Sequence, residues 1–204
     1  MKISIIRPHN PGLLAMMLAI IMTCALMAGC GDAKLTTQTV QGTKTAIQID
    51  LPFTLENQLK EEQIPQMAYI QSLSESTTTK AKGMDFHLAQ FMTFQLDADK
   101  FAAAGAEVQQ AFPQKAANFY LKLFEKHAQI SETNRDVKDV TIDGHAAKIY
   151  TITCKMKGED ENFKLLALPL DGEIWFVNFA YPKEHEDDRG KLAEKILQSV
   201  KVQQ

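Results

Sequence analysis

The sequence has little that would make the protein basic, cross-linked or disordered. Its 204 residues carry 22 Lys and Arg against 25 Asp and Glu, a formal net charge of -3, and no run of basic residues stands out. Because nucleic-acid binding draws its affinity from excess positive charge, DNA or RNA binding is not expected. The 3 Cys, 10 Gly and 7 Pro are too few for a disulfide scaffold or a collagen-like chain. With 45% hydrophobic residues, the composition is that of an ordinary globular protein.

The familiar motifs of catalysis are also missing from the sequence beyond its N-terminal segment. It has no Gly-x-Ser-x-Gly elbow, no His-Glu-x-x-His pair, no Walker loop, no Cys-x-x-Cys and no Gly-x-Gly-x-x-Gly. Many hydrolases assemble their sites from residues that are distant in sequence, so this absence counts against an enzyme only in part. No cofactor is expected, and nothing in the sequence fixes a molecular activity.

The first 29 residues differ in kind from the rest. Lys2 and Arg7 are their only charged residues, and residues 13–28 are apolar apart from Thr23. A membrane-spanning helix needs about 20 apolar residues, so this run is short for a permanent anchor and suits the core of an export signal. The sequence therefore predicts that residues 1–29 are a signal peptide.

The end of this segment, Leu26-Met27-Ala28-Gly29-Cys30, resembles the lipobox of bacterial lipoproteins. In that family a diacylglycerol is attached to the cysteine thiol, and signal peptidase II then cuts before the cysteine. The resemblance implies cleavage between Gly29 and Cys30, with Cys30 as the lipidated first residue of the mature chain. Met27 stands where the family usually has Leu. The alternatives are an uncleaved N-terminal helix or cleavage by another peptidase, and both still export the domain.

Lipid at Cys30 would set the location of the protein. Two or three acyl chains such as palmitate hold a protein on a membrane without a helix, since each buried CH2 contributes about 0.8 kcal/mol of membrane affinity. In lipoproteins that stay in the inner membrane, the residue after the lipidated cysteine is often an aspartate, and here it is Gly31. The periplasmic face of the outer membrane is therefore expected in a diderm host. Cys154 would be the one thiol left free, and we expect a buried apolar side chain there rather than a reactive one.

The mature chain is interpreted as a tether followed by one domain. Residues 30–44 have few apolar groups and are predicted to be the lipidated Cys and a flexible tether, which leaves residues 45–204 for a single domain. Alternation of apolar and polar residues predicts a strand over 45–51, and a hairpin is predicted from 68–79 and 84–96.

Helices and a strand meander are expected in the rest of the domain. Helices are predicted over 100–110, 113–130 and 184–198, the first two separated by a break at Phe112-Pro113. Asp143-Gly144 and Asp171-Gly172 are strong hairpin turns, and the strands predicted around them are 137–142, 145–156, 163–170 and 173–181. The fold class is therefore α+β, an antiparallel sheet with helices packed on both faces.

The order of these elements resembles that of the PsbP/DcrB-like group. The residues that carry the resemblance are Ile-Asp-Leu-Pro-Phe at 49–53, Ile174-Trp175-Phe176, and the closing run from Ile196 to Val202. Members of that group are small exported lipoproteins or accessory proteins with an α/β/α sandwich and are not known for catalysis. The resemblance implies a binding or assembly role, and it transfers no catalytic residue to this chain.

Several polar clusters in the sequence are candidate sites. His185-Glu186-Asp187-Asp188 would place His185 and Asp188 one helical turn apart as candidate metal ligands, but negative charge in the first turn of a helix explains the cluster as well. The run from Gly158 to Asn162 is interpreted as a hairpin tip rather than a calcium loop. Trp175 and the aromatic residues that follow it favour core packing over a stacking surface for glycans or peptides.

The preferred hypothesis is a lipid-anchored envelope protein that binds an envelope protein or another envelope component without turning it over. The alternative is an envelope hydrolase with a dispersed site among His87, His127, His145 and the carboxylates. The alternative would gain support from a cleft that gathers two of these histidines with a carboxylate of shifted pKa. Thiol chemistry at Cys154 is a third possibility.

Overall fold

The computed structural model describes residues 34–55, 59–67, 69–79, 86–128 and 130–203. Its contacts divide the chain into Met1–Lys34 and Leu35–Gln204, and the fold below is that of the second unit. The predicted signal peptide, Cys30 and the predicted loop at 80–83 lie outside the described residues. Within the described part of the chain, no helix is long and apolar enough to cross a membrane.

Seven antiparallel strands form the large sheet, in the order β3-β4-β5-β9-β8-β7-β6. Their bounds are β3 (Lys60–Met67), β4 (Ile70–Thr79), β5 (Leu88–Leu96), β6 (Ile130–Ile142), β7 (His145–Met156), β8 (Glu159–Leu170) and β9 (Glu173–Pro182). The meander from β6 to β9 confirms the antiparallel α+β prediction. Asp143 and Gly144 both take positive φ, 49° and 85°, as a two-residue hairpin turn requires.

The turn between β7 and β8 is tighter than the sequence suggested. Lys157 and Gly158 have φ of 53° and 90° and form the whole turn, so β8 begins at Glu159 rather than at residue 163. The acidic residues predicted to form a hairpin tip therefore start a strand. Glu161 points to the same side as Cys154, its partner in the register of the two strands.

A second, three-stranded sheet has the order β1-β2-β10, with β1 (Thr36–Gln41), β2 (Ala46–Leu51) and β10 (Lys201–Gln203). β2 matches the predicted first strand. β1 lies in the segment predicted as a tether, so the compact unit begins at Leu35 rather than at residue 45. The polar residues of β1 misled the prediction because Val40 is the only buried one, which an edge strand of a small sheet allows.

The helical segments are α2 (Ala98–Ala103), α3 (Ala106–Ala128), a 3-10 turn η1 (Lys183–His185), a π-helical turn η2 (Glu186–Gly190) and α4 (Lys191–Gln198). The predicted helix break at Pro113 is wrong, because Pro113 lies inside α3 and the chain breaks at Gly105, where φ is 80°. Phe112 and Ala116 on either side of Pro113 are buried. Continuing the helix keeps both on the sheet, which offsets the lost backbone hydrogen bond.

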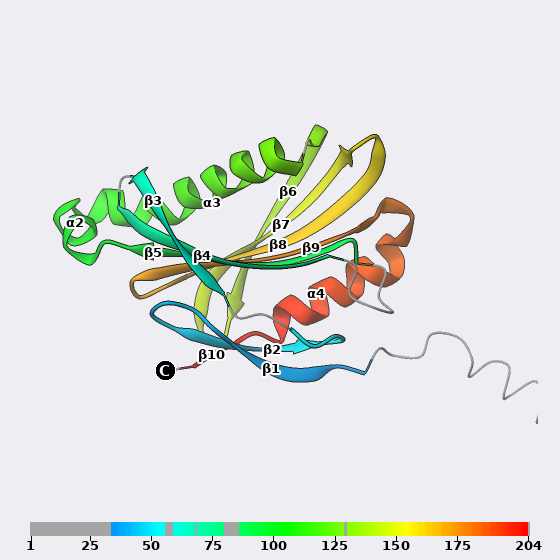
Figure 1. The fold of residues 1–204 in the computed structure, drawn as a ribbon, viewed down its shortest axis with the longest axis horizontal. Coiled ribbons are helices and arrows are strands. Elements are labelled where there is room, and N and C mark those ends of the chain that lie inside the picture. Colours follow the sequence, from blue (N-terminus) through cyan, green and yellow to red (C-terminus); the bar gives the residue numbers. More distant parts are fainter. Residues whose placement is uncertain (1–33, 56–58, 68, 80–85, 129, 204) are drawn as a thin grey trace, which may run out of the picture. The chain divides into compact units, whose positions relative to one another are not determined.

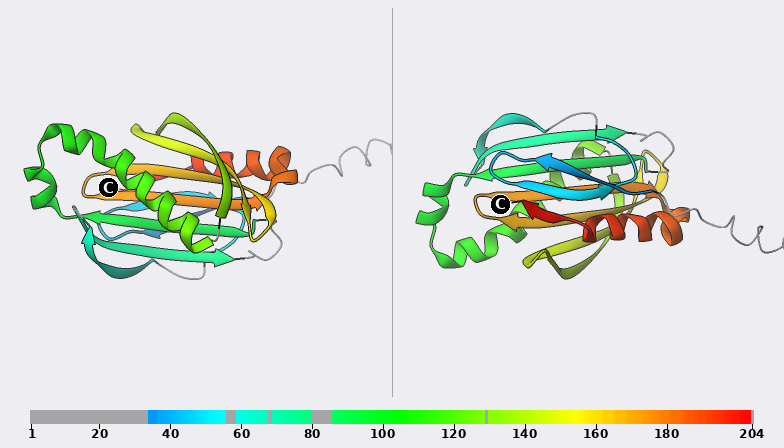
Figure 2. Two further views of the ribbon diagram at one scale, coloured as in Figure 1. Left: turned by 90° about the horizontal axis from the view of Figure 1, so that it is seen from above. Right: turned by 90° about the horizontal axis from the view of Figure 1, so that it is seen from below.

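The two faces of the large sheet carry different layers (Figure 1). Helix α3 crosses the strands on one face, while the small sheet and α4 lie side by side on the other, as the two views of Figure 2 show. Each layer encloses its own apolar core. One core joins Tyr120 and Phe124 of α3 to Phe163 and Phe176, and the other joins Ile47 and Ile196 to the opposite side of the sheet.

The central strand β9 is buried on both faces. Trp175, Val177 and Phe179 belong to the core under α4, and Phe176 belongs to the core under α3. Each of these side chains is 0% exposed. The prediction that the aromatic residues pack in the core is confirmed.

A buried carboxylate ties the small sheet to the large one. Glu173, which is 0% exposed, accepts hydrogen bonds from the backbone N–H of Thr43 at 2.8 Å and from the hydroxyl of Thr45 at 2.7 Å. The indole N–H of Trp175 donates to the same hydroxyl at 2.8 Å. A Cβ at Gly42 would lie 2.6 Å from the Trp175 ring, so the close approach of the two layers requires glycine there.

Candidate functional site

The histidines weighed in the sequence do not gather into one site. His87 precedes β5 and lies at the end of the sheet where β7 turns into β8. His145 begins β7 beside Asp143, roughly 33 Å along that strand from Lys155, which borders the same turn as His87. The side chain of His127 lies outside the described residues. Of the three histidines in the dispersed hydrolase site, His87 is therefore the one whose surroundings remain a candidate site.

An open, acidic pocket of about 660 Å³ lies at that end of the sheet. The ends of four neighbouring strands build it, since β5, β9, β8 and β7 are adjacent in the sheet. Its lining consists of His87, Lys155, Gly158, Glu159, Asp160, Glu161, Pro182 and Glu184. Four of these eight residues carry carboxylates, so the pocket has a negative potential that favours cations.

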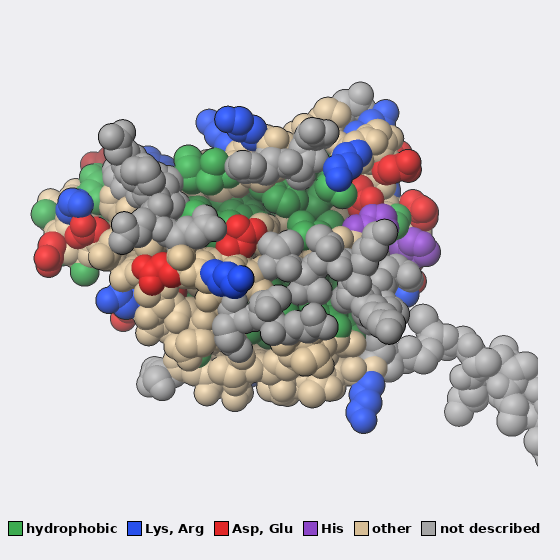
Figure 3. All heavy atoms as spheres, viewed as in Figure 1, with side chains coloured by type: hydrophobic (Ala, Val, Ile, Leu, Met, Phe, Trp, Pro, Cys, Tyr) green, Lys and Arg blue, Asp and Glu red, His purple; other side chains and the backbone are tan. Residues whose placement is uncertain are grey.

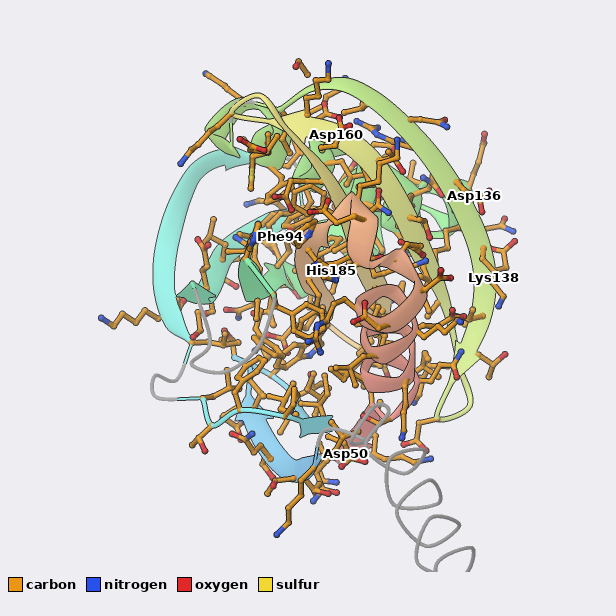
Figure 4. All side chains as sticks on the ribbon, turned by 90° about the vertical axis from the view of Figure 1, so that its right-hand side faces the viewer. Asp50, Phe94, Asp136, Lys138, Asp160 and His185 are labelled. Carbon is orange, nitrogen blue, oxygen red and sulfur yellow. The ribbon has the colours of Figure 1, made fainter. Side chains whose placement is uncertain are left out.

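The surface views agree with this composition. In Figure 3, histidine side chains lie beside acidic side chains at the right-hand end of the unit. Figure 4 looks onto that end, with Asp160 labelled on the strand that follows the β7–β8 turn and His185 on the turn after β9.

Glu161 is the deepest carboxylate of the pocket. Its side chain is 2% exposed, whereas Glu159, Asp160 and Glu184 lie at the surface. His87 Nδ1 lies 2.7 Å from Glu161 Oε1, and the imidazole N–H donates this hydrogen bond when the carboxylate is ionised. The other oxygen, Oε2, is buried and has no hydrogen-bond partner among the described residues. A buried oxygen left in this way costs free energy until a donor reaches it.

The electrostatics of Glu161 follow from this placement. Burial raises the pKa of its carboxyl group, and the hydrogen bond from His87 opposes that rise. The carboxylates of Glu184 and Glu159 add to the rise, because a further negative charge nearby disfavours ionisation. A cation in the pocket would favour the ionised form of Glu161 and so oppose the rise in its pKa.

Cys154 lies next to Glu161 across the strand pair and is buried, as predicted. Burial raises the pKa of its thiol to about 11, and the nearby Glu161 and Asp160 contribute to the rise. The thiolate is the reactive form of cysteine, so this thiol is poorly suited to nucleophilic or redox chemistry near neutral pH.

His185 and Asp188 come together as their spacing predicts, with His185 Nδ1 3.6 Å from Asp188 Oδ1. Within the described part of the chain, no three His, Cys, Asp or Glu side chains converge where a metal ion could be held. The predicted helix over 184–198 is corrected here, since residues 183–190 form a 3-10 turn and a π-helical turn before α4 begins.

Glu186, next to His185 in the same acidic cluster, makes hydrogen bonds that the sequence did not predict. Its Oε2 accepts hydrogen bonds from Tyr181 at 2.8 Å and from Asn162 at 2.7 Å, and Lys164 Nζ lies 3.2 Å from its Oε1. Burial alone would raise the pKa of Glu186, but these donors outweigh it and the pKa is lowered. Glu186 thus fixes the turn after β9 to strand β8.

A second pocket lies between α3 and strand β7. It has a volume of about 190 Å³ and is lined mainly by apolar groups, among them Pro113, Ala117 and Ala147. The side-chain amide of Gln114 donates to the Tyr150 hydroxyl at its edge, at 3.0 Å.

The role of Glu161 was missed by sequence reasoning, which placed it in a solvated hairpin tip. The signal was its phase, because Glu161, Phe163 and Leu165 alternate with Asn162 and Lys164 and so share one face of a strand. An acidic residue in phase with buried apolar ones indicates a buried carboxylate, which is rarely without a function or a partner.

No protein-family model and no curated protein sequence matches the chain. Solved structures do. The cyanobacterial PsbP of Synechocystis is matched at 11% identity with a TM-score of 0.50, over 86% of this chain and 96% of that one. A Pseudomonas aeruginosa protein of unknown function, described as a putative regulator, gives 11% identity and a TM-score of 0.43, over 80% and 94% of the two chains.

LpqN of Mycobacterium tuberculosis, described as involved in cell envelope biogenesis, gives 15% identity and a TM-score of 0.41, over 85% of this chain and 94% of that one. Identities this low establish nothing about activity, and of the three only the PsbP match is close enough in structure to support an argument about the fold. The chain therefore has a PsbP-like α+β fold.

Proposed function

We propose that this chain is a lipid-anchored protein of the cell envelope whose folded unit binds an envelope component without turning it over. The observation that carries the proposal is the position of Cys30. It ends a signal-like apolar segment with small residues before it, and the folded unit begins only five residues later at Leu35.

This spacing has a geometric consequence for a lipidated protein. An extended chain spans at most about 3.6 Å per residue, so five residues reach roughly 18 Å. Helix α3 alone, with 23 residues, is roughly 35 Å long. A lipid at Cys30 therefore keeps the folded unit against the membrane surface, where a partner in or on that membrane is within reach.

The chemistry of the candidate site supports binding more than turnover. A single histidine–carboxylate pair is present in the acidic pocket, and the neighbouring thiol is held neutral by burial. The PsbP-like fold is consistent with a non-catalytic accessory role. In a diderm host, we propose the periplasmic face of the outer membrane as the location.

The proposal is tested by expressing the full chain in a diderm host and following its processing and its membrane fraction with and without globomycin, an inhibitor of signal peptidase II. We expect the wild-type protein to be cut and to fractionate with membranes, and globomycin or Cys30→Ala to leave an uncut precursor. Cys154→Ala is the matched control and should be processed normally. Normal processing in the presence of globomycin and in the Cys30→Ala variant would overturn the proposal.

The hydrolase alternative retains one observation in its favour. His87 and Glu161, 2.7 Å apart in an open pocket, have the arrangement of a general base oriented by a carboxylate. A hydrolase of this kind would release product from envelope glycans or lipids, and His87→Ala would abolish the release. The binding proposal predicts that neither the wild-type protein nor His87→Ala releases product.

A further inference from the structure

We propose that the acidic pocket at the β7–β8 end of the sheet binds a primary ammonium group, carried either by a lysine side chain of a protein partner or by a free polyamine. This inference rests on the proposed binding role and names its ligand class. Its failure would leave the test of the lipid anchor untouched, because the two experiments have different readouts.

Glu161 has one carboxylate oxygen that lacks a hydrogen-bond donor within the described part of the chain. Its Oε1 is bonded to His87, but its buried Oε2 has no donor among the described residues. The ligand that completes this carboxylate must bring an N–H or O–H group. Glu161 itself lines the pocket, so a donor bound there would lie beside this carboxylate.

The charge of the pocket favours a cationic ligand. Glu159, Asp160 and Glu184 are exposed and line the pocket together with the buried Glu161. His87 and Lys155 are the basic side chains of the same lining. An anionic ligand would meet four carboxylates, whereas a cation is attracted by them. The negative rim also draws the cation toward Glu161 before any hydrogen bond forms.

The size and geometry of the pocket suit an organic cation better than a metal ion. The described residues offer no group of three side chains that could hold a metal. The pocket volume of about 660 Å³ is far larger than the roughly 30 Å³ that one water molecule occupies in the liquid. It has room for an ammonium group together with the alkyl chain that carries it.

The donor requirement gives a sharp test. A primary ammonium carries three N–H donors, whereas a quaternary ammonium has the same charge and none. The full-length protein, purified in detergent, would be titrated by calorimetry with putrescine, with the bis-quaternary analogue of putrescine, and with Mg²⁺ alone. We expect putrescine to bind at least about tenfold more tightly than the quaternary analogue or Mg²⁺, which is the size of effect expected from a hydrogen bond to a charged group.

Two variants locate the site. Glu161→Gln keeps the size of the side chain and should weaken putrescine binding about tenfold or more. Asp171→Asn, in the turn between β8 and β9, changes the net charge equally but lies outside the pocket, and it should bind like the wild type. Should Glu161→Gln fail to fold, Glu184→Gln at the exposed rim provides the second variant, with an expected loss of about threefold.

A third arm separates the two sources of the ammonium group. A blocked peptide with one central lysine is compared with putrescine and with the same peptide carrying trimethyl-lysine. Tighter binding of the lysine peptide than of putrescine supports a protein partner, and the reverse order supports a free polyamine. Equal affinity for the primary and quaternary ligands, or equal affinity of Glu161→Gln and the wild type, would overturn the inference.

Discussion

Gly190, the residue that joins the π-helical turn to α4, lies against the carboxylate of Glu186. A Cβ at position 190 would lie 2.6 Å from Glu186 Oε1 and 2.9 Å from Oε2. That carboxylate accepts hydrogen bonds from Tyr181 and Asn162, and it faces the ammonium of Lys164. We therefore predict that Gly190→Ala destabilises the fold by displacing Glu186 from these partners.

The magnitude follows from two opposing effects. Gly190 has φ -61° and ψ -45°, a helical conformation in which alanine is normally about 1 kcal/mol more favourable than glycine. Displacing the carboxylate breaks two hydrogen bonds to a charged acceptor, each about 1.5–3 kcal/mol. Tyr181 and Asn162 are 0% and 5% exposed, so neither is readily satisfied by solvent. The net loss in unfolding free energy should be about 2–5 kcal/mol.

The assay is urea unfolding of the full chain in mild detergent, followed by the fluorescence of Trp175, the single tryptophan, which is buried. The decisive measurement repeats Gly190→Ala in a Glu186→Ala background, where the obstacle is gone. There the substitution should stabilise the protein by about 0.5–1 kcal/mol. A change of the same sign and size in both backgrounds would refute the reasoning, because it would show that Glu186 is not what the new methyl group meets.

Three further predictions follow from buried groups. Because the pKa of folded Glu161 is raised above its ordinary value of 4.5, the folded state binds more protons above that value, so stability should fall as pH rises from 4.5 through the raised pKa. Glu161→Gln should flatten this slope in urea midpoints measured across pH, and an unchanged slope would contradict the assignment. Cys154 should resist a maleimide in the native protein and react on adding urea, in contrast to an exposed cysteine introduced by Asp171→Cys; rapid native labelling would show that the thiol is accessible. Glu173→Ala should lower the unfolding free energy by about 3–5 kcal/mol, because it removes the acceptor of the hydrogen bonds donated by residues 43–45. A loss below about 1 kcal/mol in the urea assay would show that the hydrogen bonds of Glu173 contribute little to stability.

The sequence predicted the meander well because its signals are local. The two Asp-Gly turns define the β6–β7 and β8–β9 hairpins without reference to the rest of the chain, whereas β6 and β8 both begin earlier than predicted, at Ile130 and Glu159. The alternation in β9 also predicted that Trp175 and Phe176 point to opposite faces of the sheet, and they lie in different cores.

The small sheet was harder to predict because it is held together by contacts between distant residues. β2 pairs with β1 and with β10, whose residues lie more than 150 positions further along the chain. β10 is only three residues long, and β1 is mostly exposed, so neither has a pattern of its own. Strand β3 is likewise absent from the prediction, and its sequence contains both charged residues and a proline.

The candidate pocket was hidden for the same reason. His87 and Glu161 are 74 positions apart, and only the adjacency of β5, β9 and β8 brings them within hydrogen-bond distance. His145 was an equally good candidate in sequence, but it starts the strand whose far end borders the pocket. Residue type alone therefore identified one member of the pair and could not identify its partner.

Intact-mass spectrometry of the purified protein from a diderm host measures directly what is attached to Cys30. We expect a chain that begins at Cys30 and carries a diacylglycerol on the thiol, with a mass increase that maps to the N-terminal peptide and disappears with Cys30→Ala. An unmodified cysteine at position 30, or a chain that begins at another residue, would contradict it.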